Sequence, residues 1–126
     1  MTPGETDLAR ETKLAARENL TAAFLLLERG LLRAAASRFY FSMFQAVVCA
    51  LARKGEKPPG GRDPYWSHRV VERMVGSVRG TSADTLLFQR LRRMRNRADY
   101  REERIERADL ELEKHDVRRF VEEVTG

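Results

Sequence analysis

The chain has 126 residues, of which 42% are hydrophobic and 34% are charged, a balance that fits one folded domain and excludes a disordered or fibrous protein. Its single cysteine, Cys49, excludes a disulfide within the chain and fits a reducing compartment. The 24 lysines and arginines exceed the 19 acidic residues and give a net charge of +5, which permits a polyanionic partner without requiring one.

The N-terminal residues Met1 to Arg10 carry several charges and lack an apolar core, so they do not form a secretory signal. The most apolar stretch, Phe39 to Ala52, is interrupted by two polar residues and is shorter than the ~20 residues that span a bilayer. We therefore expect a cytoplasmic protein without a membrane segment, in which this stretch is a buried helix.

Two long helices are predicted in the first half of the chain. Glycines at positions 30, 55 and 80 stand where helical periodicity stops, as glycine does just past helix C-termini. The first helix is expected from about Asp7 to Arg29. Its inward residues are expected to include Leu8, Ala15, Ala22 and Leu26. The second, from about Leu32 to Lys54, is apolar on nearly every side and must be surrounded, by the rest of the bundle alone or together with a partner chain.

The segment from Glu56 to Tyr65 contains three prolines and two glycines and is predicted to be the longest loop. Asp63 followed by Pro64 fits a cap for a third helix that extends to about Arg79. The apolar residues of this helix at helical spacing are Val70, Val71, Met74, Val75 and Val78.

Two further helices complete the prediction. Thr81 and Asp84 match the capping-box pattern that opens a fourth helix, and a fifth is expected from about Arg107 to Val124. The residues expected to be buried in these two helices are Leu87, Leu91, Met94, Ala98, Val117, Phe120, Val121 and Val124. Because no segment alternates like a strand, the sequence predicts one all-α domain over residues 1–126, a five-helix bundle.

Arg38, Ser42 and Gln45 are predicted to share one side of the apolar second helix. A buried guanidinium without a partner costs several kcal/mol, so we expect Arg38 to meet an acid, backbone carbonyls or a ligand. Two interpretations stay open. The stripe is an internal polar network that fixes helix register, or it binds a ligand.

Residues 90–100 read RLRRMRNRADY and form the second polar group. Helical spacing places Arg92, Arg95 and Asp99 near Phe88 on one flank and places Arg90, Arg93 and Arg97 on the other. A charged run is usually a solvated face with i, i+4 pairs such as Arg95 with Asp99. A dense set of guanidinium groups with few acids also generates a positive field suited to phosphates. Tyr100 adds a ring and a hydroxyl for base stacking or for modification.

Other chemistry has little support in the sequence. His68 and His115 are far apart and lack acidic or thiolate companions, so we expect no metal site. The chain has no glycine-rich phosphate loop and no nucleophile elbow, and we expect no cofactor. His68, near the start of the third helix, is interpreted as a surface or capping residue.

Three pieces of sequence carry a family resemblance. Residues 37–44 are similar to an "SR-x-YY-x-x-F" core, His68 follows at the usual distance in a loop-to-helix position, and RNRADY at residues 95–100 is similar to an "R-x-x-ADY" signature. With these pieces the chain resembles the HEPN superfamily, and within it the small prokaryotic proteins of the UPF0332 type, from about Ala16 to Val124.

The resemblance implies a bundle built around an up-down helix pair that commonly forms a homodimer, bringing two arginine-bearing helices together across a cleft. Active HEPN ribonucleases carry an arginine followed a few residues later by a histidine and cleave RNA without a metal. The arginine holds the scissile phosphate, and a titratable group moves the 2′-hydroxyl proton. The resemblance assigns Arg95 to the first role and Asn96 to the polar position beside it. Tyr100 replaces the histidine, and a phenol with a pKa of about 10 is a poor base at neutral pH.

Similar proteins are often encoded beside a minimal nucleotidyltransferase and act with it as toxin and antitoxin. In some of them a tyrosine close to the motif is adenylylated. The resemblance makes Tyr100 the candidate acceptor of that modification.

Three hypotheses follow from the sequence. The first is a dimeric HEPN toxin-like protein that binds RNA. Metal-independent cleavage would require Arg95, Asn96 and Tyr100 to hold the scissile phosphate and to move the 2′-hydroxyl proton. The second is a non-catalytic module that binds a nucleotide or serves as partner subunit of a minimal nucleotidyltransferase. The third is an assembly protein whose arginines only solvate its surface. The residues expected to bind RNA or nucleotide are Arg38, Gln45, Arg92, Arg93, Arg97 and Asp99.

Overall fold

The structure, a computed structural model, describes residues 6–59, 66–100 and 104–126, and of Tyr100 only the backbone. Within these residues the chain forms five helices and no strand, which confirms the predicted all-α class. The helices are α1 (Asp7–Glu28), α2 (Leu32–Arg53), α3 (His68–Arg79), α4 (Ser82–Tyr100) and α5 (Arg107–Thr125). Helices α1, α2 and α5 match the expected bounds to within one residue, and α3 ends at Arg79 as expected but begins at His68, later than a cap at Asp63 and Pro64 predicts.

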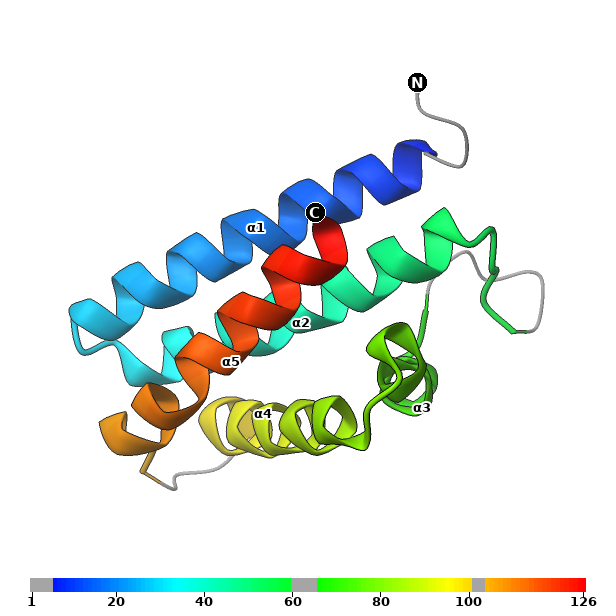
Figure 1. Ribbon diagram of the computed structural model, residues 1–126. Coiled ribbons are helices and arrows are strands. Elements are labelled where there is room, and N and C mark those ends of the chain that lie inside the picture. The colour runs from blue at the N-terminus through cyan, green and yellow to red at the C-terminus, as the bar shows by residue number, and fades with distance from the viewer. Residues whose placement is uncertain (1–5, 60–65, 101–103) are drawn as a thin grey trace.

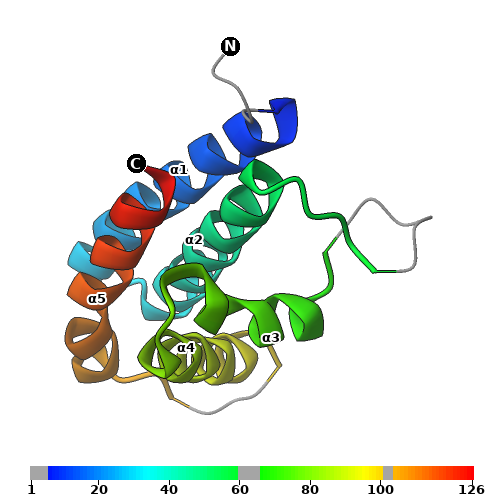
Figure 2. The same cartoon turned by 45° about the vertical axis from the view of Figure 1, so that its right-hand side comes forward.

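The bundle is built around the antiparallel pair of α1 and α2 (Figure 1). At their turn, Gly30 adopts φ +74°, and the amide of Leu31 donates to the carbonyl of Leu26, a helix ending that favours glycine because a Cβ is disfavoured there. The C-terminal helix α5 packs against both members of the pair, while α4 and the short α3 pack against α2 from its other side (Figure 2). Helix α2 therefore packs against all four other helices.

The core is centred on α2, as its continuous apolar surface predicts. Its largest fully buried side chains are Tyr40, Phe39, Met43 and Leu51, and Phe88 of α4 and Phe120 of α5 are equally buried. By length and composition alone, α2 could cross a membrane, but 67% of its most apolar window is buried by the other helices. The surroundings of α2 are thus those of a core helix in a helical bundle.

The inward face predicted for α1 is wrong by one residue. Leu8 is 42% exposed, and Ala15, Ala22 and Leu26 are only partly buried. The buried positions are Ala9, Thr12, Ala16, Leu20, Ala23 and Leu27. Because α1 contains adjacent apolar residues, two helical stripes one position apart fit its sequence, and only packing against α2 selects between them.

Two predicted helix caps also differ. Helix α3 is capped by Ser67, whose Oγ accepts from the amide of Val70 at 3.2 Å; Asp63 and Pro64, which were expected to cap it, lie outside the described residues. At the start of α4, Thr81 accepts from the amide of Ala83, but Asp84 does not complete the capping box. Its carboxylate instead binds Arg79 of α3, with Nη2 to Oδ1 at 2.7 Å. The carboxylate of Asp84 is therefore used in an ion pair between α3 and α4 and not in a cap of α4.

Candidate functional site

Arg95 lies over aromatic rings of α2 and not in bulk solvent. Its guanidinium carbon is 4.9 Å from the ring centroid of Phe41 and 5.5 Å from that of Tyr40, and its side chain is only 18% exposed. The apolar face of α4 packs on α2, which turns the neighbouring flank with Arg92 and Arg95 toward these rings. The cation–π contacts stabilise a charge that has lost most of its water.

The pair predicted from i, i+4 spacing is present. Nε of Arg95 lies 3.1 Å from Oδ2 of Asp99, but the N–H does not point at an acceptor, so this contact is an ion pair without a hydrogen bond. Within the described part of the chain, no N–H group of Arg95 donates a hydrogen bond. A guanidinium carries five such donors, so Arg95 keeps most of its hydrogen-bonding capacity for another acceptor.

Arg92, one turn earlier, reaches α3. Its Nη1 lies 3.4 Å from Oε1 of Glu72, and both side chains are partly exposed. The pair joins α3 to α4 and keeps a second positive charge beside Arg95. Exposed ion pairs of this kind contribute about 1 kcal/mol or less, so Arg92 can exchange Glu72 for another anion at small cost.

His68, the first residue of α3, completes this group. Its ring stacks on Tyr40 with centroids 5.5 Å apart and an interplanar angle of 18°, and its Nδ1 is hydrogen-bonded to the Tyr40 hydroxyl. The rings of Phe41 and Phe44 lie 6.0 and 5.0 Å away. His68 is half-buried in this aromatic group, so its interpretation as a surface or capping residue is wrong, because packing of α3 on α2 encloses it.

The electrostatics of the two hydrogen-bonded groups follow from burial and from the arginines. Burial, followed by the charges of Arg95 and Arg92, lowers the pKa of His68 below its ordinary value of 6.5. Burial raises the pKa of Tyr40 to about 12, although both arginines act in the opposite direction. At neutral pH the imidazole is therefore uncharged and the phenol keeps its proton. The name Arg95 cluster is used below for Tyr40, Phe41, His68, Glu72, Arg92, Arg95 and Asp99.

The polar stripe expected on α2 does not form an internal network. Arg38 is exposed, contrary to the expected buried guanidinium, and its Nη1 donates to Oδ1 of Asn19 at 3.0 Å. Ser42 is buried but donates to the carbonyl of Phe39 in its own helix. Gln45 is half-buried on the same helix. The three side chains therefore have separate surroundings and share no hydrogen bond in the described residues.

A hollow of about 380 Å³ lies between α2 and the end of α4, beside the Arg95 cluster. It is lined by Arg33, Ala34, Ser37, Arg38, Phe41 and Asp99. Arg38 and Asp99, both predicted site residues, thus line the same hollow as Phe41, over whose ring Arg95 lies. The Arg95 cluster is accessible from this hollow at Phe41 and Asp99.

The second flank of α4 faces a different part of the molecule. Arg90, Arg93 and Arg97 line a hollow of about 240 Å³ against α5. There Arg90 binds the buried carboxylate of Glu113 through two hydrogen bonds of 2.9 and 3.2 Å. The predicted site residues Arg93 and Arg97 are therefore separated from Arg95 by the body of α4. Asn96 is exposed, and the side chain of Tyr100 lies outside the described residues.

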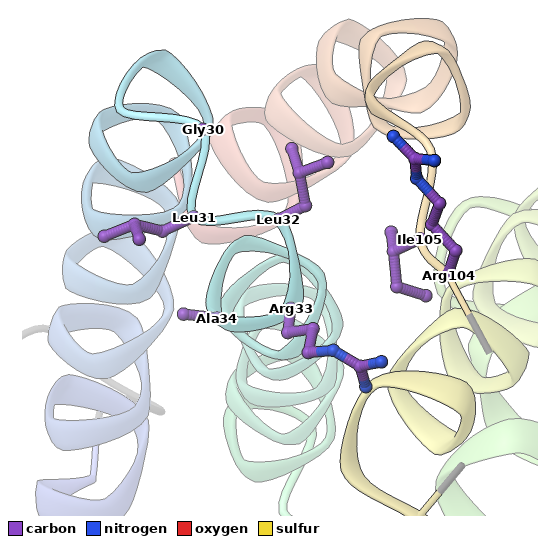
Figure 3. A pocket seen from close by; sticks show the side chains of 7 residues that line it. All are labelled: Gly30, Leu31, Leu32, Arg33, Ala34, Arg104 and Ile105. Atoms are coloured by element: carbon purple, nitrogen blue, oxygen red, sulfur yellow. The ribbon is translucent and has the colours of Figure 1, made fainter. Parts of the chain in front are cut away.

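A larger hollow of about 640 Å³ lies at the turn between α1 and α2. Figure 3 shows Leu32 and Ile105 facing into it, with Arg33 directed toward α4 and Arg104 toward α5. Nη1 of Arg33 donates to the carbonyl of Ala98 at 2.7 Å, which ties α2 to the last turn of α4. None of the predicted site residues whose side chains the structure describes lines this hollow, but Arg33 and Ala34 also line the one beside the Arg95 cluster.

The described residues contain no group of three His, Cys, Asp or Glu side chains that could hold a metal ion. Cys49 is buried. The chemistry available in the Arg95 cluster is therefore that of guanidinium, imidazole, phenol and carboxylate groups.

Comparison with known proteins gives two findings. Residues 9–126 match a family model described as HEPN domain. A UPF0332 protein from Pyrococcus horikoshii is 51% identical over 59 residues, which are 47% of this chain and 37% of the relative. The chain thus aligns with little more than a third of that relative's length.

Proposed function

The chain belongs to the HEPN domain family, and we propose that it binds RNA through the Arg95 cluster, with a backbone phosphate taking the place that Asp99 now holds beside Arg95. The proposal follows from the chemistry of that guanidinium. Arginine binds phosphate through two parallel N–H groups at once, and such charge-assisted bonds are about twice as strong as neutral ones.

The observation that carries the proposal is the state of Arg95. Its side chain is 18% exposed and lies over two aromatic rings, while its only ion pair in the described part of the chain is the one with Asp99. A merely solvating arginine extends into water, and a merely structural one donates hydrogen bonds to buried acceptors, as Arg90 does to Glu113. Arg95 does neither, which supports a role in holding an external anion.

Neighbouring groups extend the same surface. Arg92 supplies a second positive charge, and Arg38 stands across the hollow from Asp99. Phe41 offers part of its ring to this hollow, where a base of single-stranded RNA could stack. We propose that Arg38 and Arg92 bind flanking phosphates. Arg93 and Arg97, on the other side of α4, are not part of this surface.

Substitution of Arg95 tests the proposal. In fluorescence anisotropy with a labelled single-stranded RNA, R95A is expected to weaken binding about tenfold or more, since the phosphate loses a charged hydrogen-bond donor. R95K keeps the charge but not the paired N–H groups, so its affinity for the RNA should lie between those of the wild type and R95A. The matched control is R119A, which removes an exposed arginine of α5 paired with Asp116. Equal binding by R95A and R119A, with unchanged helical content, would refute the proposal.

Salt dependence separates binding to phosphate from unspecific effects. For single strands, the slope of log K against log salt changes by about 0.7 for each phosphate that the protein no longer neutralises. R95A is therefore expected to reduce the slope by about that amount. A weaker affinity with an unchanged slope would mean that Arg95 supports the fold of the site and does not touch phosphate.

We also propose the finer roles that the family resemblance implies: a toxin of a toxin–antitoxin pair, a homodimer and a cytoplasmic location. Cleavage is tested in the same samples by following RNA length in a metal-chelating buffer, and dimer formation by sedimentation. The replacement of the motif histidine by Tyr100 favours a second candidate, a non-catalytic module that binds a nucleotide or a minimal nucleotidyltransferase. Calorimetry with nucleotides, together with intact RNA after long incubation, would support it.

A further inference from the structure

The hydrogen bond between Tyr40 and His68 lies next to Arg95. Both residues fall in pieces of sequence that carry the family resemblance, but the resemblance assigns neither of them a role. His68 and Arg95 are neighbours of the same two rings, because His68 stacks on Tyr40 and lies 6.0 Å from Phe41 while Arg95 lies over both. The charge of Arg95 also acts on His68 more strongly than that of any other group, so the shared rings and this interaction are the grounds for placing a ligand of Arg95 within reach of the imidazole.

We infer that the Tyr40 hydroxyl holds His68 as the Nε2–H tautomer, so that the imidazole donates a hydrogen bond to the phosphate bound by Arg95. The inference rests on the proposed function for its ligand. Tyr40 is in this scheme a positioning residue, which acts through His68, and His68 is a binding residue.

Counting donors and acceptors fixes the direction of the hydrogen bond. The Tyr40 side chain is buried, and the only hydrogen-bond partner of its hydroxyl in the described residues is Nδ1 of His68. If Nδ1 carried the proton, the phenolic O–H would be a buried donor without an acceptor, which costs about 1–3 kcal/mol. The phenol must therefore donate, and the single proton of a neutral imidazole is then on Nε2.

The groups that face His68 keep it neutral. Arg92 and Arg95 approach from α4, Tyr40 approaches from α2, and on α3 itself Glu72 is already paired with Arg92. The positive end of the α3 dipole acts in the same direction, since His68 is its first residue. An uncharged imidazole offers one N–H donor without adding a third positive charge to the cluster.

The second ring nitrogen completes the geometry. No hydrogen-bond partner of Nε2 is found among the residues that the structure describes, so its N–H remains available for a ligand. A neutral ring with its proton on Nε2 and its Nδ1 occupied has no free lone pair. His68 is consequently a donor to phosphate and not the base that takes a 2′-hydroxyl proton.

The tautomer can be measured directly in the protein without RNA. In two-bond ¹H–¹⁵N spectra of ¹⁵N-histidine protein at neutral pH, we expect Nε2 of His68 to resonate as a protonated nitrogen and Nδ1 as an unprotonated one. The H115Q variant assigns the two histidines. In Y40F the ¹⁵N shifts should move toward those of an unconstrained neutral histidine, in which the Nε2–H form is only the major one of two exchanging tautomers. A proton on Nδ1 of His68 in the wild-type protein overturns the inference, whether or not Y40F folds.

Binding variants test the interaction of His68 with phosphate. Using the same labelled single-stranded RNA, H68A is expected to weaken binding about tenfold, whereas H68Q, whose amide nitrogen can replace Nε2–H, should retain most of the affinity. On adding RNA, the Nε2 resonance of His68 should shift and its proton should be protected from exchange. Equal losses in H68A and H68Q, or an unchanged Nε2 resonance at RNA saturation, overturn the inference.

The two proposals fail in different ways. If R95A binds RNA as well as the wild type, the proposed function fails, even where the free protein shows the expected tautomer. If R95A loses binding while Nε2 of His68 is unprotonated or unaffected by RNA, the RNA-binding function stands and the role of Tyr40 and His68 is refuted.

Discussion

His68 couples the Arg95 cluster to the pH dependence of folding. Its pKa in the folded protein lies below 6.5, so below that pH the unfolded chain binds more protons at this residue than the folded one. The free energy of unfolding should therefore decrease as the pH falls through 6.5, with this contribution complete only above it. The carboxylates titrate in the same experiment, so a comparison with a variant is needed.

We predict that this acid sensitivity is smaller in H68Q. Urea unfolding at about pH 7.5 and about pH 5.5 gives the change in free energy of unfolding for each protein, and the wild type should lose more between the two values than H68Q does. Equal losses in the two proteins would mean that His68 titrates as an exposed histidine.

Single residues show what spacing can and cannot reveal. The pairing of Arg95 with Asp99 is local, four positions apart on one helix, and the sequence predicts it. The partner of His68 is Tyr40, which is 28 positions earlier, and no periodicity relates them. Only the family's spacing of His68 pointed to this residue, and its chemical role depends on how α3 packs against α2.

At the level of elements, α3 and α4 approach each other closely at Gly76. A Cβ built there would lie 2.6 Å from Oγ1 of Thr85, closer than such atoms pack. Because α3 carries His68 and α4 carries Arg95, the absence of a side chain at Gly76 sets the spacing of the two helices that form the Arg95 cluster.

We predict that G76A lowers the free energy of unfolding by about 1–2 kcal/mol, since overpacking outweighs the gain in helix propensity. In a T85A background the obstructing oxygen is gone, and the same change should raise the free energy of unfolding by about 0.5–1 kcal/mol. Chemical denaturation of the four proteins of this cycle measures the coupling. The same effect of G76A in both backgrounds would contradict the close approach.

Element boundaries were more predictable than element faces. Glycine at the helix ends and runs of apolar residues predict the existence of all five helices, because these signals are local, and only the start of α3 was expected too early. The buried face of α1 could not be chosen from its sequence, since neighbouring alanines and leucines fit two stripes. The expected capping box of α4 failed for a related reason, because Asp84 has a partner, Arg79, on another helix.

For the whole molecule, the position of α2 at the centre determines stability. Leu51 of α2 is fully buried, whereas Leu112 of α5 is 75% exposed. A cavity in a helix that packs against all the others weakens the whole bundle, so local damage is expected to appear as global unfolding.

We predict that L51A lowers the free energy of unfolding by about 2–5 kcal/mol in a single cooperative transition. The same substitution at Leu112 should change it by about 0.5 kcal/mol or less. Circular dichroism in the far and near ultraviolet should report coincident transitions for L51A. Separate transitions would show that the helices unfold in independent groups.

The two flanks of α4 illustrate the limit of prediction at this scale. The sequence groups its arginines into one positive run, but in the folded chain Glu113 of α5 neutralises Arg90 on one flank, and aromatic rings of α2 receive Arg95 on the other. Which arginines remain available to a ligand is decided by distant segments that no local pattern relates to them.

The ion pair between Arg95 and Asp99 gives the resting protein an internal competitor. An incoming anion must displace the carboxylate of Asp99 from Arg95. A carboxylate from solution forms the same kind of ion pair that it displaces, so the net free energy of binding is small. A phosphodiester that also accepts hydrogen bonds from Arg92 or His68 forms more interactions than the Arg95–Asp99 ion pair that it displaces. On the proposed function, ligands whose anionic groups are carboxylates alone are therefore expected to bind the Arg95 cluster more weakly than a phosphodiester does.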